Sequence, residues 1–237
     1  MFVHRPRAEA EPADVFWDRV RAHLDARPAV QCAFVQAVAT GDAPIESVRH
    51  FARDLFKIAH ELPLIEGEIA SRAALHGVET VIWLSHGATL AFGYQHHEPL
   101  VDLVDRFAEA VGVDRADGIG ASLPAEAFLV CVRSLGLEWF EAGVAATMVD
   151  EQWRAAAAAL AEGLGKHYGL NRDELACFDA LASFDGPRTT ERPKLLREIA
   201  VSGYHQHVVG EAAREVVTVW NNLWDAWTPG RVPLRLE

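Results

Sequence analysis

The C-terminal stretch of the chain, residues 192–227, constrains the fold more than any other part of the sequence. One residue in every three or four falls on a single helical line, which consists of Glu198, Ser202, His205, Val209, Ala212, Val216, Val219 and Leu223. The second half of this line is apolar, so we expect one long helix over 192–227 that packs against a core. The first half places a carboxylate and an imidazole on the same face. A charged group there is costly unless it is paired, hydrogen-bonded or bound to a metal.

Helical periodicity recurs through the rest of the chain. We expect further helices over residues 13–27, 28–41, 44–75, 78–87, 97–112, 125–135, 138–164 and 172–184. Pro63 lies inside the third of these and is expected to kink it. No alternating strand pattern longer than a few residues occurs. The sequence therefore predicts an all-α fold, a single-domain bundle of about seven to eight helices. This bundle spans residues 13–230, between a flexible arm at 1–12 and a tail at 231–237.

Composition excludes several classes of partner. The chain has 237 residues, half of them hydrophobic, which fits one domain with a large core. Its net charge of −12 and the lack of any Lys/Arg-rich run argue against binding to nucleic acid or to an anionic membrane. No run reaches the length of a membrane span, and the N-terminus lacks the apolar region of a signal peptide, so we expect a cytoplasmic protein.

The three cysteines, Cys32, Cys131 and Cys177, lie far apart in apolar helical segments. Their number and spacing argue against a disulfide framework and against a zinc site, and we expect them to be buried. The tryptophans Trp220, Trp224 and Trp227 are expected to pack in the core and at a dimer surface.

Carboxylates and histidines fall on the apolar faces of four predicted helices. These residues are Glu61 and Glu68 in helix 44–75, His97 in helix 97–112, Glu141, Asp150 and Glu151 in helix 138–164, and Glu198 and His205 in the last helix. A helical bundle holds a pair of iron or manganese ions with such a combination. The alternative is that each carboxylate sits at the edge of its stripe, in water. The Glu-x-x-His spacing of ferritin-like sites is absent.

Four segments occur in an order that is similar to a known family. They are FARDLFKIAHELPLIEGEIA, HEPLVDLVDRFAEAVGV, VDEQW and AEGLGKHYGLNRDELACF, which together cover about residues 45 to 180. This order resembles the haem-oxygenase-like helical fold of TenA-type thiaminases, of the pyrroloquinoline-quinone biosynthesis oxidase PqqC and of the haem-oxygenase-like di-iron oxidases.

The resemblance implies roles for particular residues. Glu61 stands where the di-iron oxidases have an early carboxylate, and His97 looks like their second-helix histidine. Glu141, Asp150 or Glu151 fits their next metal-binding carboxylate. In TenA-type thiaminases a cysteine nucleophile falls near VDEQW, where this chain has Asp150 and Glu151, while Cys131 and Cys177 lie elsewhere.

The last ligand helix of the family has the pattern His-x3-Asp-x2-His, and this chain departs from it. The match Glu198-x3-Ser202-x2-His205 keeps the spacing with two ligands changed, whereas Leu181-x3-Asp185-x2-Arg188 loses both histidines. We prefer the first match, because Asp185 is followed by Gly-Pro and fits a turn.

The resemblance favours an O2-dependent, non-haem di-iron oxidase with two irons per chain, cycling between Fe(II) and Fe(III). It would act on a C–H or C–N bond of a small substrate, an amino acid or amine, by desaturation, cyclisation or N-oxygenation. Arg53, Lys57 and Tyr204 are candidate substrate-binding residues, and a homodimer stays open. Two alternatives also stay open. One is a metal-free TenA/PqqC-like enzyme with Glu215 as its acid–base residue, and the other is a non-catalytic binding protein.

Overall fold

The computed structural model describes residues 9–73, 98–114, 120–138, 149, 151–183, 198 and 200–231. These residues form helices and connecting turns, and no β-strand is found among them. The helices are α1 (Ala13–Asp25), the 3-10 turn η1 (Ala29–Gln31), α2 (Ala33–Thr40), α3 (Ile45–Ala73), α5 (Leu100–Ala110), α6 (Leu123–Glu138), α8 (Glu151–Tyr168), α9 (Ala176–Ser183) and α12 (Gly203–Ala226). The expected all-α bundle is confirmed. The predicted helix 78–87, residues 1–8 of the arm and residues 232–237 of the tail lie outside the described residues.

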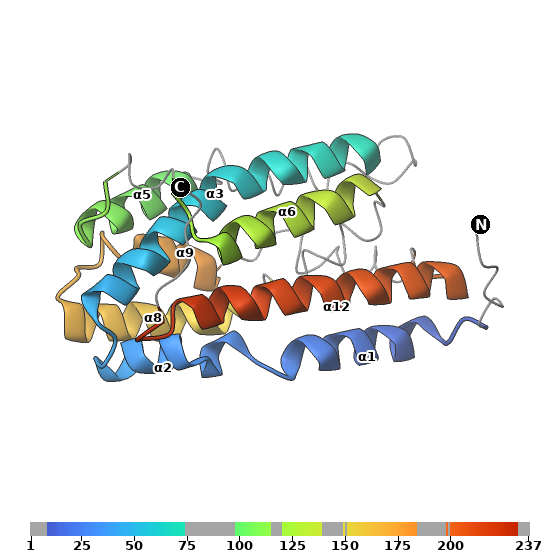
Figure 1. Cartoon of the computed structure of the whole chain (residues 1–237), viewed down its shortest axis with the longest axis horizontal. Coiled ribbons are helices and arrows are strands. Elements are labelled where there is room, and N and C mark those ends of the chain that lie inside the picture. Colours follow the sequence, from blue (N-terminus) through green and yellow to red (C-terminus); the bar gives the residue numbers. More distant parts are fainter. Residues whose placement is uncertain are drawn as a thin grey trace.

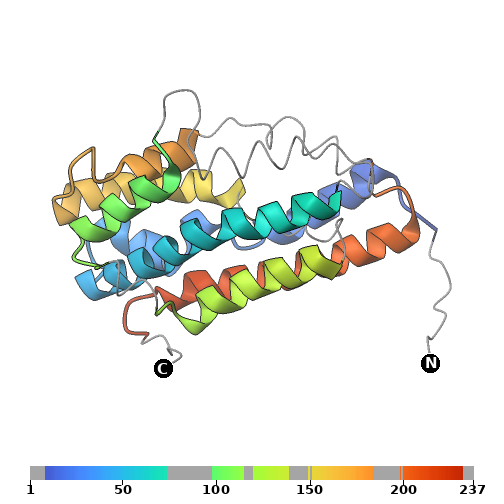
Figure 2. The same ribbon diagram turned by 90° about the horizontal axis from the view of Figure 1, so that it is seen from above.

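The long helices lie side by side along the long axis of the molecule (Figure 1). Helix α6 packs against both α3 and α12, and α12 also contacts α1. Helices α2, α5, α8 and α9 gather at one end of the bundle, where α8 packs on α2 and α9, and α5 packs on α3 and α9 (Figures 1 and 2). The opposite end is therefore formed by the last turns of α3 and α6 and the first turns of α1 and α12 (Figure 2).

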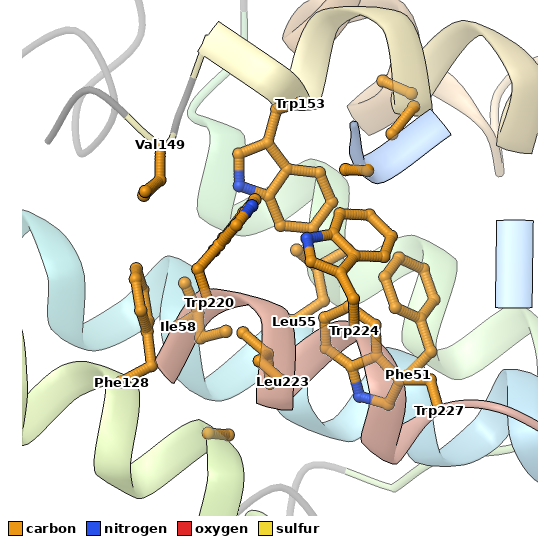
Figure 3. Close-up of a cluster of buried hydrophobic side chains, with 14 of the residues drawn as sticks. Phe51, Leu55, Ile58, Phe128, Val149, Trp153, Trp220, Leu223, Trp224 and Trp227 are labelled. Atoms are coloured by element: carbon orange, nitrogen blue, oxygen red, sulfur yellow. The ribbon is translucent and has the colours of Figure 1, made fainter. Parts of the chain in front are cut away.

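Aromatic side chains fill the core at the end of the bundle that holds α2, α5, α8 and α9. The Phe51 ring lies between 4.9 and 6.4 Å, centroid to centroid, from five other rings, those of Phe34, Phe107, Trp153, Phe178 and Trp227. Trp224 contacts Trp153, Trp220 and Trp227 at 4.9–5.6 Å (Figure 3). Aromatic pairs at these separations add to the stability that burial provides.

The predicted role of the tryptophans at a dimer surface is wrong. Trp220, Trp224 and Trp227 are at most 2% exposed in the single chain. Their rings pack on one another and on rings from α3 and α8, so the core of one chain covers them completely.

A buried carboxylate joins three helices in this aromatic half. Asp54 of α3 is 2% exposed. The Ser122 N–H donates to Asp54 Oδ1 at 2.8 Å, and the Ser122 hydroxyl donates to Oδ2 at 2.6 Å. The Trp227 indole N–H donates to the same Oδ2 at 2.8 Å. Asp54 thus fixes the start of α6 and the end of α12 against α3.

The last helix is shorter than the sequence predicts. Instead of a continuous helix over 192–227, α12 begins at Gly203, and residues 200–202 are not helical. Ser202 has an extended backbone (φ −134°, ψ 153°), and its hydroxyl accepts a hydrogen bond from the His205 N–H at 3.2 Å. Serine in this geometry is a strong helix N-cap, so it starts a new helix and does not continue an old one. Glu198 and His205 therefore do not share one helical face.

None of the described helices combines the length and the apolar composition that a membrane span requires.

We predict that Asp54→Ala lowers the free energy of unfolding by at least about 3 kcal/mol, because three buried donors lose their acceptor. Chemical denaturation of the variant measures this loss. Asp18→Ala, which removes an exposed carboxylate from α1, is the control and is expected to stay within about 0.5 kcal/mol of the wild type. Equal stability of the two variants would contradict the role assigned to Asp54.

Candidate functional site

One carboxylate lies in the core without a solvent-exposed surface. Glu66 on α3 is 0% exposed, as are its neighbours on the same helix, Ile65 and Ile69. It makes a polar or electrostatic interaction in the structure, which is what a buried charge requires. Glu66 is about 18 Å along α3 from Asp54, at about 1.5 Å per residue. It thus lies beyond the aromatic core, toward the last turns of α3.

The side chains that α12 buries toward this end are small. Its buried residues between 209 and 217 are Val209, Gly210, Ala212, Ala213, Val216 and Val217. Tryptophans follow only at 220, 224 and 227. On α3 and α12 the bulky aromatic residues are therefore confined to the Asp54 end, and the buried aromatic rings at the Glu66 end, Phe16 and Trp17, come from α1.

The two glutamates predicted on α3 lie elsewhere. Glu61 is half-buried and ion-paired with Lys57, with Nζ 2.5 Å from its carboxylate. Glu68 is exposed and pairs with Arg133 of α6 at 3.1 Å. Both carboxylates lie on the outer seam between α3 and α6, where Glu68 bridges the two helices and Glu61 pairs within α3.

Sequence reasoning missed Glu66 because of the helical phase. At about 100° per residue, the buried positions of α3 define an arc that includes Glu66 but excludes Glu61 and Glu68. The signal was available in the sequence, since Glu66 lies four residues after Leu62 and three before Ile69, both apolar.

The other predicted metal ligands are separated from one another in the described part of the chain. Glu151 is exposed in the first turn of α8, and Glu198 is exposed before α12 begins. His205 is half-buried, with its Nδ1 3.2 Å from the Ser202 hydroxyl. His97, Glu141 and Asp150 lie outside the described residues. Within the described ranges, no three His, Cys, Asp or Glu side chains lie close enough to share a metal ion.

The predicted substrate-binding residues occupy three different environments. Lys57 lies between the carboxylates of Glu61 and Glu126, which are 2.5 and 3.6 Å from its Nζ. The hydrogen bond that Lys57 donates to Glu61 raises the pKa of Lys57 above its usual value, so its charge is already matched within the seam. Arg53 is half-buried on α3, and Tyr204 is half-exposed beside His205.

A histidine–aspartate pair links α3 to α5. His60 Nε2 is 3.0 Å from Oδ1 of Asp105, which is 6% exposed. The Phe56 ring stacks on the imidazole at 4.4 Å. The pair holds α3 and α5 together. Glu215, the acid–base candidate on α12, is exposed.

The three thiols are poor nucleophiles. Burial raises the pKa of Cys32 to about 11 and that of Cys131 to about 12, and burial also raises the pKa of Cys177. All three thiols are therefore protonated at neutral pH, and thiolate is the reactive form. The expectation that the cysteines are buried is confirmed for Cys131 and Cys177, while Cys32 is partly buried.

The comparisons with known proteins show the fold. No family model and no curated protein sequence matches the chain. A domain of unknown function with a haem-oxygenase-like fold from Shewanella denitrificans is similar in structure, with a TM-score of 0.70, 11% identity and coverage of 90% of each chain.

Two TenA homologues are also similar. The one from Pseudomonas syringae has a TM-score of 0.66 and 9% identity, and the match covers 92% of this chain and 93% of that one. The homologue from P. horikoshii has a TM-score of 0.59 and 14% identity, with coverage of 89% and 98%. The chain has the haem-oxygenase-like helical fold. The resemblance stated from the sequence is confirmed at this level.

We predict that the cysteines of the native protein react slowly with iodoacetamide. At pH 8, alkylation is expected to be at least tenfold slower than for the same thiols in the unfolded chain, because the raised pKa values leave little thiolate. Mass spectrometry of the quenched reaction gives the rate for each cysteine. Rapid alkylation of one cysteine in the folded protein would contradict this prediction and would make that cysteine a candidate nucleophile.

Proposed function

We propose that the protein is an enzyme that acts on a small molecule inside the bundle, at the end where Glu66 is buried. The observation that supports this proposal is the complete burial of the Glu66 carboxylate beside Ile65 and Ile69 on α3. Such a group is costly to bury, and buried ionisable groups concentrate at functional sites. The aliphatic neighbours Ile65 and Ile69 would exclude water from it.

Helices α3 and α6 finish at the end of the bundle where Glu66 lies, and α12 starts there (Figures 1 and 2). In the sequence, His97 falls between α3 and α5, and Glu141 falls between α6 and α8; both lie outside the described residues. We propose them as further ligands on the ground of the resemblance to the di-iron oxidases.

The form of the activity that the resemblance favours is an O2-dependent di-iron oxidation of a small amino acid or amine. A carboxylate shielded from water suits iron, which takes carboxylate and imidazole ligands. Glu66 fits this role because it is fully buried, whereas Glu61 and Glu68 lie in ion pairs on the partly exposed outer seam. We therefore propose Glu66 as the ligand from α3, with His97 and with Glu141 or Asp150 as its partners. Bound iron would supply the activation of O2, and the chain would supply its ligands and a dry pocket.

We predict that the wild-type protein binds two Fe(II) per chain under anaerobic conditions and that Glu66→Gln weakens this binding at least tenfold, because an amide is a poorer iron ligand than a carboxylate. Glu68→Gln is the matched control on the same helix, and it is expected to leave iron binding unchanged. Anaerobic titration followed by metal analysis measures both variants, and circular dichroism confirms that each is folded.

Equal iron binding by the wild type and Glu66→Gln would contradict the role of Glu66. The absence of iron binding by the wild type would contradict the oxidase. If Glu68→Gln lost more iron binding than Glu66→Gln, the iron site would instead lie on the outer seam between α3 and α6.

A metal-free enzyme is the second candidate, and the structural similarity to TenA homologues favours it. In this case Glu66 would act as the acid–base residue of the interior, since Glu215 is exposed. The raised thiol pKa values argue against a cysteine nucleophile.

We predict for this candidate that the iron-free protein hydrolyses thiamin or a related aminopyrimidine and that Glu66→Gln abolishes the reaction. Chromatography of the products from chelator-treated protein tests it. No turnover of these compounds, together with no iron binding, would instead support a non-catalytic binding protein.

A further inference from the structure

The amide of Gln206 joins two segments that lie far apart in the sequence. Gln206 is 6% exposed in the second turn of α12. Its Oε1 accepts from the Glu11 N–H at 3.0 Å, and its Nε2 donates to the Glu11 carbonyl at 2.7 Å. The same Nε2 donates to the Ala200 carbonyl at 3.0 Å. One side chain therefore satisfies both backbone groups of Glu11 and also holds the turn before α12.

The segment that Gln206 holds is residues 9–12, here called the N-terminal strap. It precedes α1, and Pro12 accepts the first hydrogen bond of that helix from Phe16 at 3.0 Å. Glu9, Ala10 and Pro12 are exposed or nearly so, while Glu11 is partly buried. The Glu11 side chain points to Arg19 of α1, with which it is ion-paired. The contact between the strap and α12 thus consists mainly of the two backbone hydrogen bonds to Gln206.

The strap lies at the end of the bundle proposed to hold the site. The first turns of α1 and α12 meet there, beside the last turns of α3 and α6 (Figure 2). Phe16 of α1 continues the contact, since it lies against Gly210 of α12.

We propose that the N-terminal strap is a latch that closes this end of the bundle and that Gln206 is its catch. Each neutral hydrogen bond contributes only about 1 kcal/mol. A latch held by two such bonds opens often, by a local fluctuation that leaves the rest of the fold intact. Opening would uncover Gln206, whose remaining hydrogen bond holds the turn 200–202, and would admit water and ligand to the interior around Glu66. The inference rests on the proposed location of the site at Glu66 and does not depend on iron.

Hydrogen exchange of the apoprotein tests the latch, and three variants separate its parts. Gln206→Ala removes the catch, and deletion of residues 1–11 removes the strap but leaves Gln206 and Pro12. Glu11→Ala is the matched control, because it removes the ion pair with Arg19 and leaves both backbone hydrogen bonds in place.

We expect exchange at residues 200–209 and at the last turns of α3, 66–73, to be about tenfold faster in Gln206→Ala and in the deletion, the factor that corresponds to about 1.4 kcal/mol. Glu11→Ala should exchange like the wild type. Acceleration in Gln206→Ala but not in the deletion would show that Gln206 only pins Ala200, and it would overturn the latch. If exchange became faster only at residues 200–209 and stayed unchanged at 66–73, the strap would not control access to the interior around Glu66, and the proposal would be overturned. Since no iron is present, failure of the latch and failure of the iron proposal are separate results.

Discussion

The position of the long helices depends on the buried carboxylate of Asp54. Three donors from two other helices converge on it, two from Ser122 and one from Trp227. A buried carboxylate that accepts three hydrogen bonds is held rigidly, because breaking any one bond leaves an unpaired group in the core. Asp54 therefore fixes where α6 begins and where α12 ends relative to α3.

This anchor divides the core into two halves with different contents. Around Asp54 the space is filled by phenylalanine and tryptophan rings (Figure 3). About three turns further along α3, the buried residues are the aliphatic Ile65 and Ile69 and the carboxylate Glu66. The aromatic half supplies the stability and the geometry.

Periodicity in the sequence was enough to predict the fold but not the site. The apolar stripes of α3, α5 and α12 identify an all-α bundle, because the spacing of three and four residues depends only on local geometry. The choice between Glu61, Glu66 and Glu68 required the helical phase, and it also required knowledge of Arg133, which is far away in sequence. Such long-range partners leave no mark in the local pattern.

The start of α12 shows a second limit of the sequence. The heptad line through Glu198 and His205 looked continuous, but the Ser202 hydroxyl offers the backbone a cap at that point. Serine suits both a helix interior and an N-cap, and the tertiary contacts around Gln206 and Ala200 select the cap. An interrupted helix of this kind cannot be distinguished from a long one by periodicity alone.

Anomalous diffraction at the iron edge, from crystals grown anaerobically with Fe(II), locates bound iron relative to Glu66. We predict an iron peak inside the bundle in direct contact with the Glu66 carboxylate. A peak on the outer seam at Glu61 or Glu68, or an iron-free interior in crystals whose surface sites are loaded, would contradict it.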